Sequence, residues 1–156
     1  MTMFLIGISS SSISGQGNDP KADTLKGINT LGVLVEDLSD GAKVIALTAE
    51  AIQTDVELKL RLAGMRVVTD KEAVKLPNVP VLYVRVGLLP RAEAAIIEVQ
   101  LEQDAVLERN GQLAYSVITW DRAGVVASPT AQFIRDRVKD NVDEFLNAWL
   151  SVNPKK

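Results

Sequence analysis

Residues 94–120 read AAIIEVQLEQDAVLERNGQLAYSVITW, which is a long alternating pattern with a turn signal inside it. Apolar side chains occupy every second position before the turn, as in a strand with one buried face. Asn110-Gly111 supplies the two positive-φ residues that a type I′ turn requires. We therefore expect strands over 94–109 and 113–120, paired so that Leu101 lies opposite Trp120 and Asp104 opposite Val117.

This pairing divides the side chains of the hairpin between two faces. The inner face is predicted to hold Ile97, Val99, Leu101, Leu107, Ile118 and Trp120. The outer face is predicted to hold Glu98, Gln100, Glu102, Asp104, Val106, Tyr115, Val117 and Thr119, joined by Tyr83 and Arg85 from a neighbouring strand. Carboxylates, tyrosines and a few apolar residues are thus expected on one surface.

The rest of the chain predicts two amphipathic helices and further strands. The strands are expected at 28–38, 65–69 and 79–89, with a turn at 121–124 and a short extension at 125–127. One helix is expected to begin after the N-cap Thr48 and end before Gly64, and the other to begin at Ser128-Pro129. In the first helix, Asp55 and Lys59 have the spacing of a local ion pair.

The resulting order, β-α-β-β-β-β-α, predicts an α+β fold. Both helices must bury an apolar stripe, and one face of the sheet is apolar. We expect a two-layer sandwich with a mainly antiparallel sheet of four to five strands and both helices on one face. The other sheet face is left to solvent or to a partner.

Composition excludes several classes of chemistry. The chain has 156 residues, a net charge of −3, and neither histidine nor cysteine. Triads built on histidine, thiolate redox centres, disulfides and His/Cys metal sites are therefore excluded, and no cofactor is predicted. The weak negative charge gives no indication of nucleic-acid binding.

The N-terminal residues 1–24 are expected to be disordered, and residues 25–156 to form a single domain. Phe4 to Ile8 form an apolar run that is too short to span a bilayer, and small polar residues follow it. With Ser12-Ile13-Ser14 before Gly15, the segment is similar to the second half of a secretory signal. We expect a truncated signal peptide and a periplasmic or exported protein, or alternatively a disordered tail on a cytoplasmic one.

Two stretches resemble segments of uncharacterised bacterial proteins, many of them exported. They are LTAEAIQTDVELKLRLAGM, residues 47–65, and FLNAWLSVNP, residues 145–154. The order of elements is also similar to that of small α/β lipoproteins that help assemble the outer membrane, such as the lipopolysaccharide-assembly lipoprotein. That resemblance implies an envelope location, although those proteins carry a lipidated N-terminal cysteine that this sequence lacks.

Three functions remain open at this stage. The first is a non-catalytic envelope or periplasmic accessory domain that binds a protein, either an envelope component or a second copy, through Tyr83, Arg85, Glu98, Gln100, Glu102, Tyr115 and Val117. The second is a carrier of a small hydrophobic ligand or lipid, with a pocket between helices and sheet lined by Leu60, Met65, Trp120 and Trp149. The third is an enzyme that uses carboxylates such as Asp55. The chain offers no histidine to act as its general base. The outer face is also compatible with an ordinary solvent-exposed sheet surface, in which Tyr and Val supply strand propensity and Glu supplies solubility.

Overall fold

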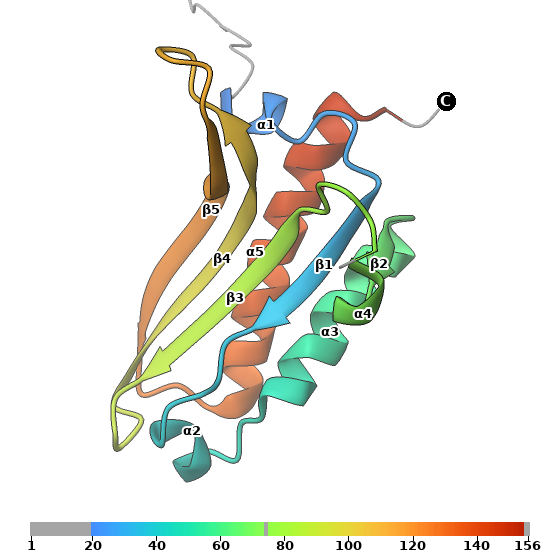
Figure 1. Ribbon diagram of the computed structural model, residues 1–156. Coiled ribbons are helices and arrows are strands. Elements are labelled where there is room, and N and C mark those ends of the chain that lie inside the picture. The colour runs from blue at the N-terminus through green and yellow to red at the C-terminus, as the bar shows by residue number, and fades with distance from the viewer. Residues whose placement is uncertain (1–19, 74, 155–156) are drawn as a thin grey trace, which may run out of the picture.

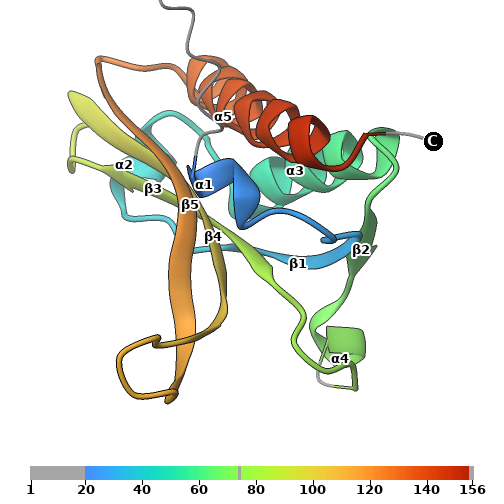
Figure 2. The ribbon, with the colours of Figure 1, turned by 90° about the horizontal axis from the view of Figure 1, so that it is seen from above.

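The computed structural model describes residues 20–73 and 75–154. Five strands form one sheet, and two long helices pack on one of its faces (Figures 1 and 2). The elements in chain order are α1 Pro20–Asp23, β1 Thr30–Val35, α2 Gly41–Val44, α3 Ala49–Leu62, β2 Arg66–Val68, α4 Asp70–Ala73, β3 Val81–Leu88, β4 Ala94–Val106, β5 Leu113–Ala127 and α5 Ala131–Val152.

The sheet is mixed, with the strand order β2-β1-β3-β4-β5. β1 pairs in parallel with β2 and β3, whereas the longer ladders β3–β4 and β4–β5 are antiparallel. Because α3 and α5 lie on the same side of the sheet (Figure 2), the predicted α+β sandwich is confirmed. The predicted order of the main strands and helices is confirmed as well.

Each long helix begins at a threonine cap. Thr48 Oγ1 accepts a hydrogen bond of 3.2 Å from the Ala51 amide, as predicted, and Gly64 follows α3 with φ of 96°. The predicted start of α5 at Ser128-Pro129 is wrong. Ser128 has φ of 43°, and Thr130 is the N-cap, its Oγ1 accepting from the Phe133 amide at 3.1 Å. The threonine has the extended backbone that an N-cap needs, and the serine does not.

The core lies between the sheet and the two long helices. Trp120 of β5 is fully buried and meets Phe145 of α5 edge to face, with ring centroids 5.3 Å apart. The residues considered as lining of a carrier pocket all belong to this core: Leu60, Met65, Trp120 and Trp149, with 0%, 3%, 0% and 8% of their surface exposed. They pack in one cluster with the other buried side chains.

β5 is one continuous strand of 15 residues, so the turn predicted at 121–124 is wrong. These four residues pair with Gln100, Val99, Glu98 and Ile97 of β4 in an unbroken register. Asp and Gly favour turns locally, but the long partner strand offers a ladder that satisfies the backbone groups of β5. The tertiary pairing therefore decides the conformation.

The hairpin register agrees with the prediction only on the side of Trp120 away from the turn. Leu101 lies opposite Trp120, as expected, but Val117 lies opposite Gln103 instead of Asp104. Register shifts between Leu101 and Glu102 and between Gln103 and Ala105 separate the two regions. The turn itself spans 108–111, because Leu107 pairs with Gln112 and its carbonyl accepts from the Asn110 and Gly111 amides. The two-residue turn is thus replaced by a longer loop, and the bulges compensate for it.

The folded part of the chain begins earlier than the expected boundary after residue 24. α1 precedes that boundary, Ala22 is buried, and Leu25 just after it is fully buried. The Gln103 side-chain amide donates to the Thr24 carbonyl at 3.1 Å, which ties this segment to β4. The signal-like residues 1–19 lie outside the described part.

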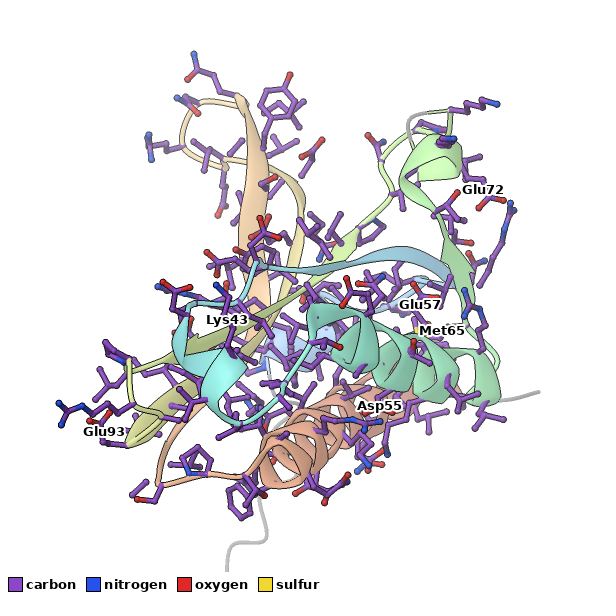
Figure 3. All side chains as sticks on the ribbon, turned by 90° about the horizontal axis from the view of Figure 1, so that it is seen from below. Lys43, Asp55, Glu57, Met65, Glu72 and Glu93 are labelled. Atoms are coloured by element: carbon purple, nitrogen blue, oxygen red, sulfur yellow. The ribbon has the colours of Figure 1, made fainter. Side chains whose placement is uncertain are left out.

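The ion pair predicted within α3 is wrong, because both residues pair across to α5. Asp55 accepts two hydrogen bonds from Arg135, at 2.7 and 2.9 Å, and Lys59 pairs with Asp143. Asp55 lies at the contact between the two helices (Figure 3), with its side chain 16% exposed. The Arg135 guanidinium, which donates to the Asp55 carboxylate, holds the pKa of Asp55 below its ordinary value.

Candidate protein-binding surface on the open sheet face

The sheet face turned away from α3 and α5, called the outer face below, has no long helix on it. α4 and the β4–β5 hairpin both extend to this side of the sheet (Figure 2). Strand alternation places Tyr83 and Arg85 of β3 and Glu98 of β4 on it, between buried neighbours. Glu102, also predicted there, is half-buried on β4.

A charged cluster of Glu36, Tyr83, Arg85 and Glu98 lies in the middle of the outer face. Arg85 and Glu98 are direct cross-strand partners, with Arg85 Nη1 3.4 Å from Glu98 Oε2. Arg85 Nε lies 3.2 Å from Glu36 Oε2, just after β1. One arginine therefore sits between two carboxylates, and its side chain remains 56% exposed.

Tyr83 is the uncharged, half-buried member of this cluster. It lies between Leu34 and Gln100 in the strand register, with Gln100 half-buried as well. Burial, and secondarily the nearby Glu36 carboxylate, raises the pKa of the Tyr83 hydroxyl, so the phenol is neutral at physiological pH. It can act as a hydrogen-bond donor to a partner but not as a base.

Tyr115 lies apart from the charged cluster, near the tip of the hairpin. It is 74% exposed, and Val106 and Leu113 beside it are 66% and 50% exposed. Tyr83 pairs with Gln100, and the amide of Ser116, next to Tyr115, donates to the Asp104 carboxylate. Gln100 and Asp104 are four positions apart on β4, so the two tyrosines are separated by about 13 Å along the strand. The predicted surface therefore consists of two separate regions.

Val117 is not on the outer face, so its place in the predicted surface is wrong. It pairs with Gln103, which alternates in phase with the buried Leu101, and so shares the helix side of β5. Ile118, predicted to face inward, pairs with Glu102 and is 50% exposed. The irregularity beside Thr119 is the cause, because one extra residue reverses the facing of the side chains between it and the second irregularity, which includes Ile118 and Val117.

An apolar hollow of about 370 Å³ lies at the far end of the outer face, where β3 turns into β4. Its lining consists of Gly87, Leu88, Leu89, Ala94, Ala95, Ile96 and Val125. Ile96 and Val125 are 48% and 74% exposed, although both are apolar. Gly87 forms the floor: a Cβ added there would meet no atom within 4 Å.

Sequence reasoning missed this hollow. The adjacent pair Ile96-Ile97 breaks strict alternation, because two large apolar residues in succession must point to opposite faces. Gly87 inside a strand pattern is a second signal, since it leaves a gap in the side-chain layer. Together they place an apolar surface around an empty position on the uncovered face.

The rim of the hollow is tied to the segment after β1. The Ser39 hydroxyl donates to the Leu88 carbonyl at 2.9 Å and accepts from the Leu88 amide at 3.2 Å. Gly41 lies so close that an added Cβ would be 2.2 Å from the Leu89 carbonyl oxygen. The end of β3, which lines the hollow, is therefore fixed by contacts outside its own ladder.

The described residues do not assemble a cluster of metal-ligating side chains. In residues 20–73 and 75–154, no three histidine, cysteine or acidic side chains lie together as metal ligands would. Within the same residues, no helix has both the length and the apolar composition that crossing a membrane requires. What the outer face offers chemically is apolar contact beside a charged, hydrogen-bonding cluster.

Comparison with known proteins gives a likeness of fold only. No family model matches the sequence, and no curated protein matches it. Among solved structures, the PelC dodecamer from Paraburkholderia phytofirmans matches with a TM-score of 0.42 and 14% identity over 79% of this chain and 87% of that one. A point variant of the same dodecamer gives 0.41 and 12%, over 80% and 89%. Nothing about the function of this chain follows from likeness at this level.

Proposed function

We propose that this chain is a non-catalytic accessory domain of the bacterial cell envelope that binds another protein through the outer face of its sheet. The observation that carries the proposal is the apolar hollow, which stays exposed beside the charged cluster. An apolar depression with polar residues around it is the anatomy of a protein-binding surface. The envelope location rests on the signal-like pattern of the first residues.

The packing of the fold explains the inner residues but not those around the hollow. Ile96 and Val125 leave about half or more of their surface in water and pack against no helix. Contact with a partner would remove this apolar area from water, at roughly 25 cal/mol per Å² before the costs of association. Arg85 and the neutral hydroxyl of Tyr83 would then supply hydrogen bonds at the edge of the contact.

The proposal is tested by cross-linking in intact cells. A benzophenone amino acid replaces Ile96 at the hollow, and in a control strain it replaces Arg137, which is exposed on α5. Irradiation followed by fractionation should give a protein adduct in the envelope fraction from position 96 and none from position 137. Mass spectrometry then identifies the adduct.

Filling the hollow gives the second half of the test. Gly87→Leu should abolish the adduct and leave thermal unfolding nearly unchanged, because a Cβ at this position has no atom within 4 Å and the hollow beside it can take the rest of the side chain. Gly124→Leu is the matched control: it also meets nothing within 4 Å, but it shares the helix side of the sheet with Ile97. Three outcomes contradict the proposal. They are equal adducts from positions 96 and 137, an adduct with a lipid in place of a protein, and an adduct at position 96 that survives Gly87→Leu.

A further inference from the structure

A second cavity, called the basic pocket below, lies at the opposite end of the sheet from the apolar hollow. It has a volume of about 410 Å³, and its lining residues lie where β1, β2 and β3 begin. Figure 1 shows the course of these three strands. Its walls come from four parts of the chain: residues 26–30, Arg66, residues 76–80 and Gln103. A cavity of this size can take a small organic molecule.

The charge of the basic pocket is unlike that of the whole chain. Lys26 and Arg66 line it without any carboxylate, whereas the chain as a whole carries −3. Over the described residues, neither cation has an ion pair. Two unpaired cations on the wall of one cavity favour an anion inside it.

Arg66 is close enough to Glu72 of α4 to affect the pKa of its carboxylate, but that carboxylate is hydrogen-bonded to Thr69. Its Oε2 accepts from the Thr69 amide at 2.8 Å and from the Thr69 hydroxyl at 2.9 Å. These two hydrogen bonds, with a smaller contribution from Arg66, lower the pKa of Glu72. The Glu72 carboxylate is therefore charged and hydrogen-bonded to Thr69. The Arg66 guanidinium remains free to bind a ligand.

Neutral polar groups complete the lining. Asn29, Thr30, Asn78 and Gln103 add amides and a hydroxyl, which can hydrogen-bond hydroxyl groups. The Gln103 side-chain nitrogen donates to the Thr119 hydroxyl at 2.7 Å and to the Thr24 carbonyl at 3.1 Å, which fixes the orientation of the side chain and leaves its carbonyl oxygen for a ligand.

The wall formed by residues 76–80 is stiff. Pro77 and Pro80 restrict its backbone, and Asn78 between them holds φ of 53°. A wall of this kind is shaped before a ligand arrives, which lowers the entropic cost of binding.

We propose that the basic pocket binds a carboxylate or phosphate group carried on a polar molecule of about monosaccharide size. Lys26 and Arg66 would hold the oxyanion, since an arginine fork and a lysine ammonium are the side chains that recognise such groups. The amides would contact hydroxyl groups of the same molecule. This site is independent of the proposed protein-binding surface, so either can fail without the other.

The test is a titration of the full chain with glucuronate, glucose 6-phosphate, inorganic phosphate and neutral glucose, followed by amide chemical shifts. Glucuronate or glucose 6-phosphate should shift the amides of residues 26–30, 76, 78 and 79, and glucose should not. Which of the two charged sugars binds more tightly distinguishes a carboxylate from a phosphate ligand. Raising the salt concentration from about 50 to 500 mM should weaken the binding several-fold.

Charge-removing variants locate the binding. Lys26→Gln and Arg66→Gln should each lower the affinity about tenfold or more, while Lys43→Gln, in an exposed pair at the other end of the molecule, should leave it unchanged. Unchanged unfolding temperatures show that the variants fold. Equal binding of glucose, no shift at these amides with either charged sugar, shifts with inorganic phosphate alone, or binding that survives both variants overturns the proposal.

Discussion

Ile96 and Ile97 are consecutive residues of β4 with opposite surroundings. Ile97 is 2% exposed and packs under the helices, while Ile96 is 48% exposed on the outer face. The same side chain thus contributes to the core at one position and lies largely in water at the next. Stability accounts for the inner residue, so the outer one is where a functional explanation is needed.

Shortening each isoleucine in turn gives the sharpest comparison of the two faces. Ile97→Ala should lower the free energy of unfolding by about 2–4 kcal/mol, because it leaves a cavity in a packed core. Ile96→Ala should change it by about 0.5 kcal/mol or less. Urea unfolding of both variants measures the difference. Similar losses at the two positions would mean that the outer face is covered in solution.

Removing one member of a charged pair should also lower the free energy of unfolding more on the helix side than on the outer face, but by less than shortening Ile97. Asp55→Asn removes the carboxylate that Arg135 binds between the helices, and should cost about 1–2 kcal/mol at neutral pH. Its folded-state pKa is depressed below the ordinary 3.8, so the stabilisation is complete above that value and is lost as the pH falls through the folded pKa. The gap between the parent and Asp55→Asn should therefore be constant from about pH 5 to 8 and close in stronger acid. A gap that persists unchanged at low pH would show that packing, and not charge, carries the effect.

On the open face, removing a charge should have the smallest effect of all. Arg85 is 56% exposed between Glu36 and Glu98, and an exposed pair contributes about 0.5 kcal/mol or less. Arg85→Gln should leave the unfolding midpoint nearly unchanged while weakening the cross-link at position 96. A large loss of stability would assign Arg85 to the fold and remove it from the surface.

The fold could be predicted from the sequence because its signals are local and agree with one another. Thr48 and Gly64 mark the ends of α3, and Ile134, Val138 and Val142 recur at the spacing of a buried helix stripe, as the structure confirms. Opposite Trp120, the hairpin register is correct because two irregularities together offset the longer turn.

The candidate surface was harder to predict because its geometry depends on distant partners. An extra residue beside Thr119 moves Val117 to the helix side, and no local signal marks that bulge. Asp55 pairs with Arg135, 80 positions away, and not with Lys59, one turn along the same helix. The two-hydrogen-bond contact with a guanidinium is the stronger interaction. The hollow at Gly87 takes part of its lining from Val125, which only the pairing of β5 with β4 places beside Ile96.

Gly41 and Gly87 lie near the same end of β3 and lack a side chain for opposite reasons. At Gly41 the space is taken by the Leu89 backbone, and at Gly87 it is empty. Evolutionary drift should therefore treat them differently. Any lineage that keeps this fold must keep a glycine at 41, whereas position 87 is free to acquire a larger residue unless something in the cell needs the space above it. If diverged relatives retain glycine at position 87, then binding of a partner, and not the fold, is what keeps a larger residue out of that position.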